Sequence, residues 1–138
     1  MKTDRFKTGC VFKYPFKWRS AASRDAEPKD RPVCMVLRVS HPSGFERIAV
    51  VAISDRAMAD DGSSIELPST ELVAAGLNPA RRAFVHLNEV NFDRIDNSFS
   101  FNPNARILGR FSKNFIAHIS RQLVANIKNK RVTTIDRS

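Results

Sequence analysis

A cation and a hydroxyl that could hold a phosphate group lie at the ends of two apolar segments. Arg31 and Pro32 precede the apolar run at residues 33–37, and Ser54 follows a second apolar run at residues 48–53. A guanidinium binds phosphate oxygens through a planar fork of N–H donors, and a hydroxyl adds one more donor. Arg31 and Ser54 are therefore a candidate phosphate site.

Two residues further along the chain could move protons at such a site. His86 lies in a strand-like run at residues 83–87, and Glu89 follows it. RNA carries its own nucleophile, the 2′-hydroxyl. A protein that cleaves it needs to orient the phosphodiester, stabilise developing negative charge and transfer two protons. Each side chain also has a structural interpretation: His86 as a strand residue bonded locally, Glu89 as an exposed strand-end acid, and Ser54 as a turn-capping hydroxyl.

An aromatic side chain between two cations is a candidate contact for an unpaired base. Trp18 is flanked by Lys17 and Arg19. An indole stacks on a base while the neighbouring cations hold phosphates, which is typical of single-stranded nucleic acid binding. The alternative is that Trp18 covers the end of the hydrophobic core.

Metal and cofactor chemistry have weaker support in the sequence. The histidines, His41, His86 and His118, fall in a turn, a strand and a helix, and no Cys or His pair has zinc-ligand spacing. Asp60 and Asp61 fit a solvated loop better than a magnesium site. The five glycines are scattered, so there is no phosphate-binding glycine loop. We expect neither metal nor cofactor.

The composition is that of a basic globular domain. The chain has 138 residues, 42% of them hydrophobic, and 23 Lys and Arg against 14 Asp and Glu, which gives a net charge of +9. This length suits one domain, and the charge favours nucleic acid or an acidic protein as partner.

The cysteines and the absence of long apolar runs indicate a cytoplasmic protein. Cys10 and Cys34 lie in apolar runs, where free buried thiols are expected in a reducing compartment. No apolar run approaches the roughly 20 residues of a transmembrane helix, and residues 1–6 lack the apolar core of a signal peptide. We expect no membrane contact.

A central hairpin is expected to position the phosphate site. Residues 33–39 and 47–53 are nearly continuous in hydrophobicity and rich in β-branched side chains, with turn residues at 41–44 between them. Antiparallel pairing would bring Arg31 and Ser54 to the same edge of the sheet. A long polar loop at residues 17–30 leads into Arg31.

Shorter strands and two helices complete the expected fold. Further strands are predicted at residues 10–14, 65–67, 83–87, 91–94 and 107–111. Pro15 should end the first of these strands. A short helix at residues 70–75 is closed by Gly76.

The one long helix is predicted at residues 113–128. Ser112 is a suitable N-cap, and an apolar stripe recurs at helical spacing. The pattern indicates a mainly β (α+β) domain, a small antiparallel barrel with a helix packed on it. We expect a single domain over residues 1–138, divided into an N-terminal arm (1–8), the barrel (9–111), the C-terminal helix (112–129) and a tail (130–138).

The order of short motifs resembles that of the MazF/PemK family of toxin ribonucleases. The motifs are Gly9-Cys10-Val11-Phe12-Lys13-Tyr14, Arg31-Pro32 with its apolar strand, Ala52-Ile53-Ser54, Val85-His86-Leu87-Asn88-Glu89 and Leu108-Gly109-Arg110-Phe111-Ser112. The resemblance covers residues 9–128.

This resemblance implies a fold, an activity and partners. It implies an SH3-like barrel, a homodimer, cleavage of single-stranded RNA without metal, and neutralisation by an acidic antitoxin. The family's arginine before proline and its strand-end hydroxyl carry over to Arg31 and Ser54. We therefore expect catalysis by Arg31, Ser54 and Glu89, and RNA contacts from Lys17, Trp18, Arg19, His86 and Asn88.

Three positions depart from the family pattern and bear on the activity. Cys10 replaces an aspartate, and His86 and Asn88 stand where some members carry an arginine and an aspartate. An amide cannot serve as an anionic base, so the proton-transfer half of the site differs from the pattern. A non-catalytic SH3-like module, or a gyrase-directed toxin of the same fold, are the alternatives.

Overall fold

A computed structural model describes residues 2–19, 29–40, 42–56, 63–96 and 98–137. Three sequence predictions fall wholly or partly outside these ranges: most of the polar loop at residues 17–30, His41 in its turn, and the acidic loop with Asp60 and Asp61. Within the described residues, the fold is mainly β, an open and largely antiparallel eight-stranded sheet with two α-helices.

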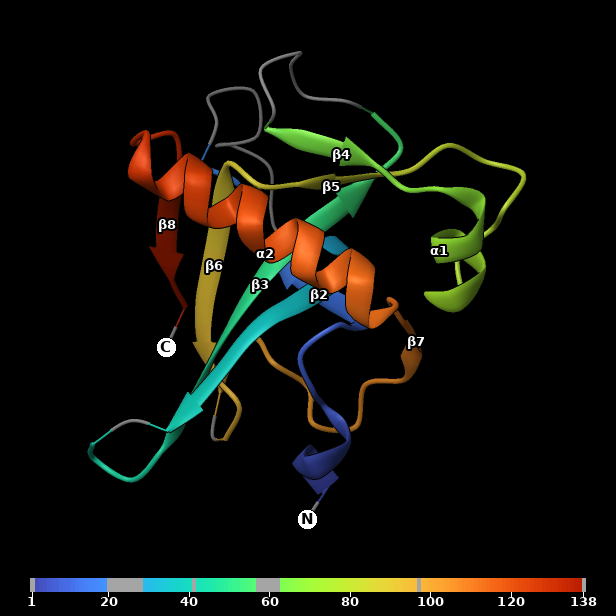
Figure 1. Cartoon of the computed structure of the whole chain (residues 1–138). Coiled ribbons are helices and arrows are strands. Elements are labelled where there is room, and N and C mark those ends of the chain that lie inside the picture. The colour runs from blue at the N-terminus through green and yellow to red at the C-terminus, as the bar shows by residue number, and fades with distance from the viewer. Residues whose placement is uncertain (1, 20–28, 41, 57–62, 97, 138) are drawn as a thin grey trace.

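The sheet is built around one central strand, β3 (Figure 1). The described elements are the 3₁₀ turn η1 Lys2–Arg5, β1 Cys10–Phe16, β2 Lys29–Ser40, β3 Glu46–Ser54, β4 Ser64–Glu66, α1 Ser69–Ala74, β5 Phe84–His86, β6 Glu89–Arg94, β7 Ile107–Arg110, α2 Lys113–Lys128 and β8 Thr133–Asp136. The main strand order is β4-β5-β3-β2-β1-β7, and β6 joins the first half of β3 to β8. The strand β3 therefore carries β6 at its start and β5 at its end.

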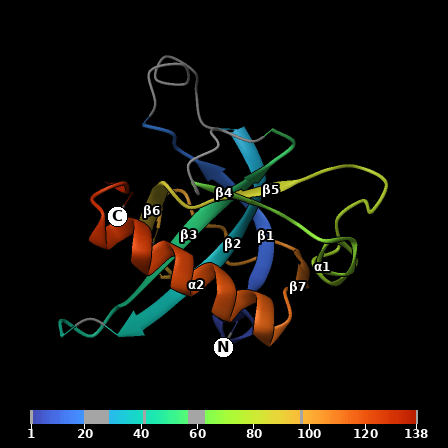
Figure 2. The same cartoon turned by 45° about the horizontal axis from the view of Figure 1, so that its top comes forward.

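The register of the central hairpin places the candidate phosphate residues opposite each other. In the β2–β3 pair, Val33 lies opposite Ala52 and Cys34 opposite Val51. Continuing this antiparallel register by two residues sets Arg31 opposite Ser54. On its other side Arg31 pairs with Tyr14 of β1. Both residues thus belong to the same end of the sheet, which Figure 2 shows with β4 and β5 beside it.

Two predicted boundaries around this end are wrong. Pro15 does not end β1, which continues to Phe16, and β2 begins at Lys29 instead of residue 33. The pairing explains the first error. The strand β7 contacts β1 only at residues 10–12, so Pro15 pairs with β2 alone and needs no amide hydrogen on its free side. The extended pairing then draws Lys29 and Asp30 into β2.

The helix α2 covers one face of the sheet (Figures 1 and 2). Its bounds are those predicted from the sequence, 113–128, and Phe115, Ile119 and Leu123 of its apolar stripe are buried against the sheet. The Ser112 hydroxyl caps it by accepting a hydrogen bond from the Phe115 amide at 3.1 Å. The opposite face of the sheet is covered by an aromatic cluster around Phe6, Phe12 and Phe101.

The C-terminal tail adds a further strand to the sheet. Residues 133–136 form β8, which pairs in parallel with β6. Arg137 anchors it by donating to the Pro15 carbonyl at 2.7 Å and to the Ser100 hydroxyl at 2.8 Å. Both cysteines are free and buried. Among the described residues, no helix is long and apolar enough to cross a membrane.

Candidate functional site

Four side chains that are distant in sequence meet at the end of the central hairpin. Ser54 is the last residue of β3, and His86 is the last residue of β5. The two strands pair with Ser54 opposite Phe84. His86 is two residues after Phe84, so its side chain lies on the same face of the sheet as those of Phe84 and Ser54. The Ser54 Oγ lies 2.6 Å from the His86 Nε2. The Trp18 ring lies 5.5 Å from the imidazole and 5.4 Å from the Arg31 guanidinium carbon.

The imidazole of His86 is a neutral group held out of water. Its side chain is 0% exposed. Burial, with a smaller contribution from the positive charge of Arg31, lowers the pKa of His86 from 6.5 to about 4. His86 is therefore uncharged at neutral pH and can share only one proton between its two nitrogens.

The hydroxyl of Ser54 joins this buried imidazole to the surface. Ser54 is half-buried, and its Oγ has a second neighbour, the Arg56 carbonyl oxygen, at 3.1 Å. A hydroxyl has one hydrogen to donate. That hydrogen goes either to the Arg56 carbonyl, with the Nε2–H of His86 then donating to the Ser54 Oγ, or to Nε2 itself; the tautomer of His86 decides between the two.

Two nitrogens in this cluster are buried without a hydrogen-bond partner among the described residues. They are the Nε of Arg31 and the Nδ1 of His86. Trp18 is half-buried over both groups, and it also packs edge-to-face on Phe16 at 5.0 Å. The Nε atoms of Arg47 and Arg94, which are cross-strand neighbours, also lack a partner among the described residues. The unpaired nitrogens of Arg31 and His86 therefore support a ligand site only together with the Ser54 and Trp18 contacts.

The other predicted catalytic residue, Glu89, has a different setting. It is buried in β6, and its carboxylate accepts a hydrogen bond from the backbone amide of Arg19. No described contact joins Glu89 to Arg31 or Ser54. The hydrogen bond to Arg19 holds the chain segment that carries Trp18. Glu89 is therefore not part of the cluster of Trp18, Arg31, Ser54 and His86.

The remaining predicted RNA-binding residues lie around Glu89. Lys17 is exposed, and its backbone amide and carbonyl are bonded to the Asn91 side chain at 2.8 and 2.9 Å. Arg19 donates to the Thr134 carbonyl at 3.2 Å. With Asn88, it lines a polar pocket of about 360 Å³. These residues form a polar, partly cationic surface.

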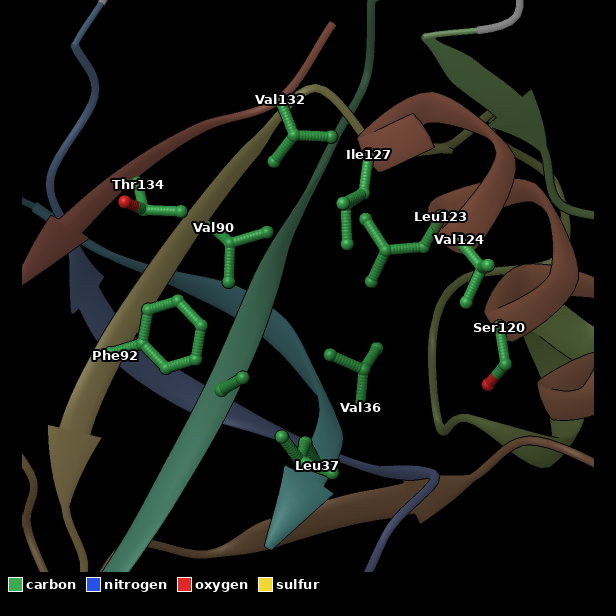
Figure 3. Close-up of a pocket in the computed structure, with 11 residues that line it drawn as sticks. Val36, Leu37, Val90, Phe92, Ser120, Leu123, Val124, Ile127, Val132 and Thr134 are labelled. Carbon is green, nitrogen blue, oxygen red and sulfur yellow. The ribbon is translucent and has the colours of Figure 1, made fainter. Parts of the chain in front are cut away.

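A second, apolar groove lies between α2 and the sheet (Figure 3). Its volume is about 550 Å³. It is lined by Val36, Leu37, Ala49, Val90, Phe92, Ser120, Leu123, Val124, Ile127, Val132 and Thr134. Leu37, Val124 and Ile127 are exposed there. None of the charged candidate residues lines this groove, so it is separate from the Arg31 cluster.

Sequence reasoning missed the partnership between Ser54 and His86. It assigned His86 to RNA contact and considered it for proton transfer, but it did not pair it with Ser54. The useful signal is positional, because both residues end apolar strands. The contact itself depends on β5 pairing with the end of β3, which no local pattern in the sequence specifies.

Neither a metal-ligand cluster nor a sequence comparison identifies the function of this site. Within the described ranges, no group of three or more His, Cys, Asp and Glu residues could hold a metal ion. No protein-family model matches the chain, and no curated protein matches it.

Proposed function

We propose that the protein is an endoribonuclease that cleaves single-stranded RNA by attack of the RNA's own 2′-hydroxyl on the adjacent phosphate. The observation that carries this proposal is the convergence of Arg31, Ser54, His86 and Trp18 at one end of the sheet. A fixed cation, a reachable hydroxyl, a neutral imidazole and an aromatic platform are the groups that such a reaction uses.

Each residue has a role in this proposal. Arg31 stabilises the negative charge that develops on the phosphate through its guanidinium group. Ser54 contacts the reacting group. Trp18 stacks on a base next to the cleaved bond, and Lys17, Arg19 and Asn88 bind the flanking backbone. Glu89 holds the Arg19 segment in place.

The proposal includes the family and the partners that the motif order implies. We infer a MazF/PemK-like toxin with an SH3-like barrel, active in the cytoplasm as a homodimer and neutralised by an acidic antitoxin. The net charge of +9 supports both RNA and an acidic protein as partners. Sedimentation at micromolar concentration tests the dimer, because a species at the chain's own 15.6 kDa contradicts it.

RNA cleavage by the purified protein tests the activity. A mixed-sequence single-stranded RNA is incubated with the protein in EDTA, and the product ends are mapped. We expect fragments ending in 2′,3′-cyclic phosphate, formed at least about 100-fold more slowly by Arg31→Ala. Arg121→Ala is the matched control, because it removes one exposed positive charge on α2.

Two other outcomes would replace the proposal. Tight RNA binding without cleavage would indicate a non-catalytic binding module. Intact RNA together with DNA damage in cells that express the protein would indicate a gyrase-directed toxin. Cleavage that survives Arg31→Ala unchanged would contradict the assignment of Arg31.

A further inference from the structure

We propose that His86 is the terminal proton acceptor of this site and that it acts through Ser54. This inference rests on the proposed ribonuclease function and identifies the base that the function requires. The Ser54 hydroxyl accepts the proton of the attacking 2′-hydroxyl while it passes its own proton to His86 Nε2.

The geometry requires the intermediate hydroxyl. His86 is 0% exposed, so its ring cannot reach a substrate directly. Ser54 is half-buried, and it is in hydrogen-bond contact with Nε2 at 2.6 Å. A base within hydrogen-bond reach of a hydroxyl that itself reaches the substrate is the arrangement needed for a two-step proton transfer. His86 is thus a positioning residue that acts through Ser54.

The alternative base, Glu89, lacks this connection. One of its carboxylate oxygens accepts from the Arg19 backbone amide, and no described contact links Glu89 to Ser54. Asn88 is an amide and cannot accept the proton. Of the two residues predicted to transfer protons, His86 and Glu89, only His86 has a described contact with the partly exposed Ser54 hydroxyl.

The proposed step balances in atoms and charge. The 2′-O–H bond breaks, and the 2′-oxygen forms a bond to phosphorus. The bond from phosphorus to the 5′-oxygen breaks, and that oxygen takes a proton from water. The imidazolium then returns its proton through Ser54 to the hydroxide that is left. The products are a 2′,3′-cyclic phosphate and a free 5′-hydroxyl.

Arg31 makes the basicity of His86 depend on whether substrate is bound. The groups that face His86 are Trp18 from the segment after β1, Arg31 from β2 and Ser54 from β3. The polar and charged residues on the neighbouring strands are Ser64 and Glu66 of β4 and Glu89 of β6. Glu66 forms an ion pair with Arg82, and Glu89 accepts a hydrogen bond from the Arg19 amide.

Arg31 is the one described charged group that lowers the pKa of His86. A phosphodiester bound to Arg31 offsets that positive charge. The pKa of His86 therefore rises on binding, and the imidazole becomes a stronger base when substrate is present.

The pH dependence of cleavage tests the inference in the wild-type protein. The acid limb of kcat/KM reports the free protein and is expected near the His86 pKa of about 4. The acid limb of kcat reports the complex and is expected at a higher pH. In His86→Gln, kcat should fall about 10²-fold or more while KM changes less than about threefold, and the acid limb should disappear. A wild-type acid limb retained in His86→Gln would overturn the inference, and His118→Gln on α2 is the matched control.

An NMR titration keeps the inference testable if His86→Gln does not fold. In ¹⁵N-labelled wild-type protein, His86 Nε2 should be the unprotonated nitrogen, and its pKa should rise in Arg31→Ala. It should also rise when a 2′-O-methyl RNA of mixed sequence, which cannot be cleaved, saturates the protein. Saturation without a change in the His86 pKa would overturn the role of His86 and leave the ribonuclease function standing. Absence of both binding and cleavage would overturn the ribonuclease function, and the inference with it.

Discussion

Two clusters of buried polar side chains in this domain differ in how completely their hydrogen bonds are made. The first surrounds Asp93 on β6, which is 0% exposed. Its carboxylate accepts from the Tyr14 hydroxyl at 2.7 Å, the Ser98 hydroxyl at 2.8 Å and the Arg94 amide at 2.7 Å. Arg137 lies over the Tyr14 ring at 5.7 Å. The second is the cluster of Arg31, Ser54 and His86.

We propose that this difference separates a structural role from a functional one. In the Asp93 cluster, burial and then the hydrogen bond to the Asp93 carboxylate raise the pKa of Tyr14, and the network ties β1 to β6. In the Arg31 cluster, two buried nitrogens lack partners in the described part of the chain. The Nε of Arg94, next to Asp93, also lacks a partner among the described residues, so the contrast lies in the fully bonded Asp93 carboxylate against the unpaired nitrogens of Arg31 and His86.

Removing the carboxylate of the bonded cluster should have the largest effect on stability. We expect Asp93→Ala to lower the free energy of unfolding by roughly 4 kcal/mol, because three hydrogen bonds to a buried carboxylate are lost and the Tyr14 hydroxyl is left buried without its acceptor. Urea unfolding monitored by circular dichroism measures this. A loss below about 1 kcal/mol would contradict the structural role of the cluster.

The pH dependence of stability should report His86. Its pKa is about 4 in the folded protein and 6.5 when unperturbed, so the unfolded chain binds the extra proton between these values. The stabilisation is therefore complete above about pH 6.5 and is lost as the pH falls toward 4, by on the order of 3 kcal/mol. Unfolding of wild type and His86→Met, compared at pH 7 and pH 4.5, isolates this contribution because the carboxylates titrate in both proteins. Equal pH slopes would show that His86 is not held neutral.

At neutral pH the same substitution should change stability least. His86→Met replaces an imidazole that has one unpaired buried nitrogen with an apolar side chain of similar size. We expect the free energy of unfolding at pH 7 to change by less than about 1 kcal/mol in either direction, because the lost bond to Ser54 is offset by the removal of a buried unpaired group. A loss as large as that of Asp93→Ala would assign His86 to the scaffold and remove the contrast between the clusters.

The sequence predicts local structure and the two ends of the hairpin well. Apolar runs and a capping serine define β2, β3 and α2, because these depend on residues within a few positions of one another. The antiparallel register of β2 and β3 then places Arg31 and Ser54 at one edge of the sheet. Long-range pairing is the part that local patterns could not give.

Three features show this limit. The parallel strand β8 depends on β6, and the continuation of β1 through Pro15 depends on where β7 stops. The Ser54–His86 contact depends on β5 taking over from β6 along β3. Each is decided by contacts between segments more than 30 residues apart, which leave no periodic signal in either segment.

The central claim is that the Arg31 cluster serves function and the Asp93 cluster serves the fold. The most direct test measures RNA cleavage and urea unfolding side by side for Arg31→Ala and Tyr14→Phe. We predict that Arg31→Ala loses at least about 100-fold in cleavage and less than about 1 kcal/mol in stability, and that Tyr14→Phe loses about 2 kcal/mol in stability and keeps its cleavage rate. Equal cleavage by wild type and Arg31→Ala, or a Tyr14→Phe protein as stable as wild type, would contradict this account.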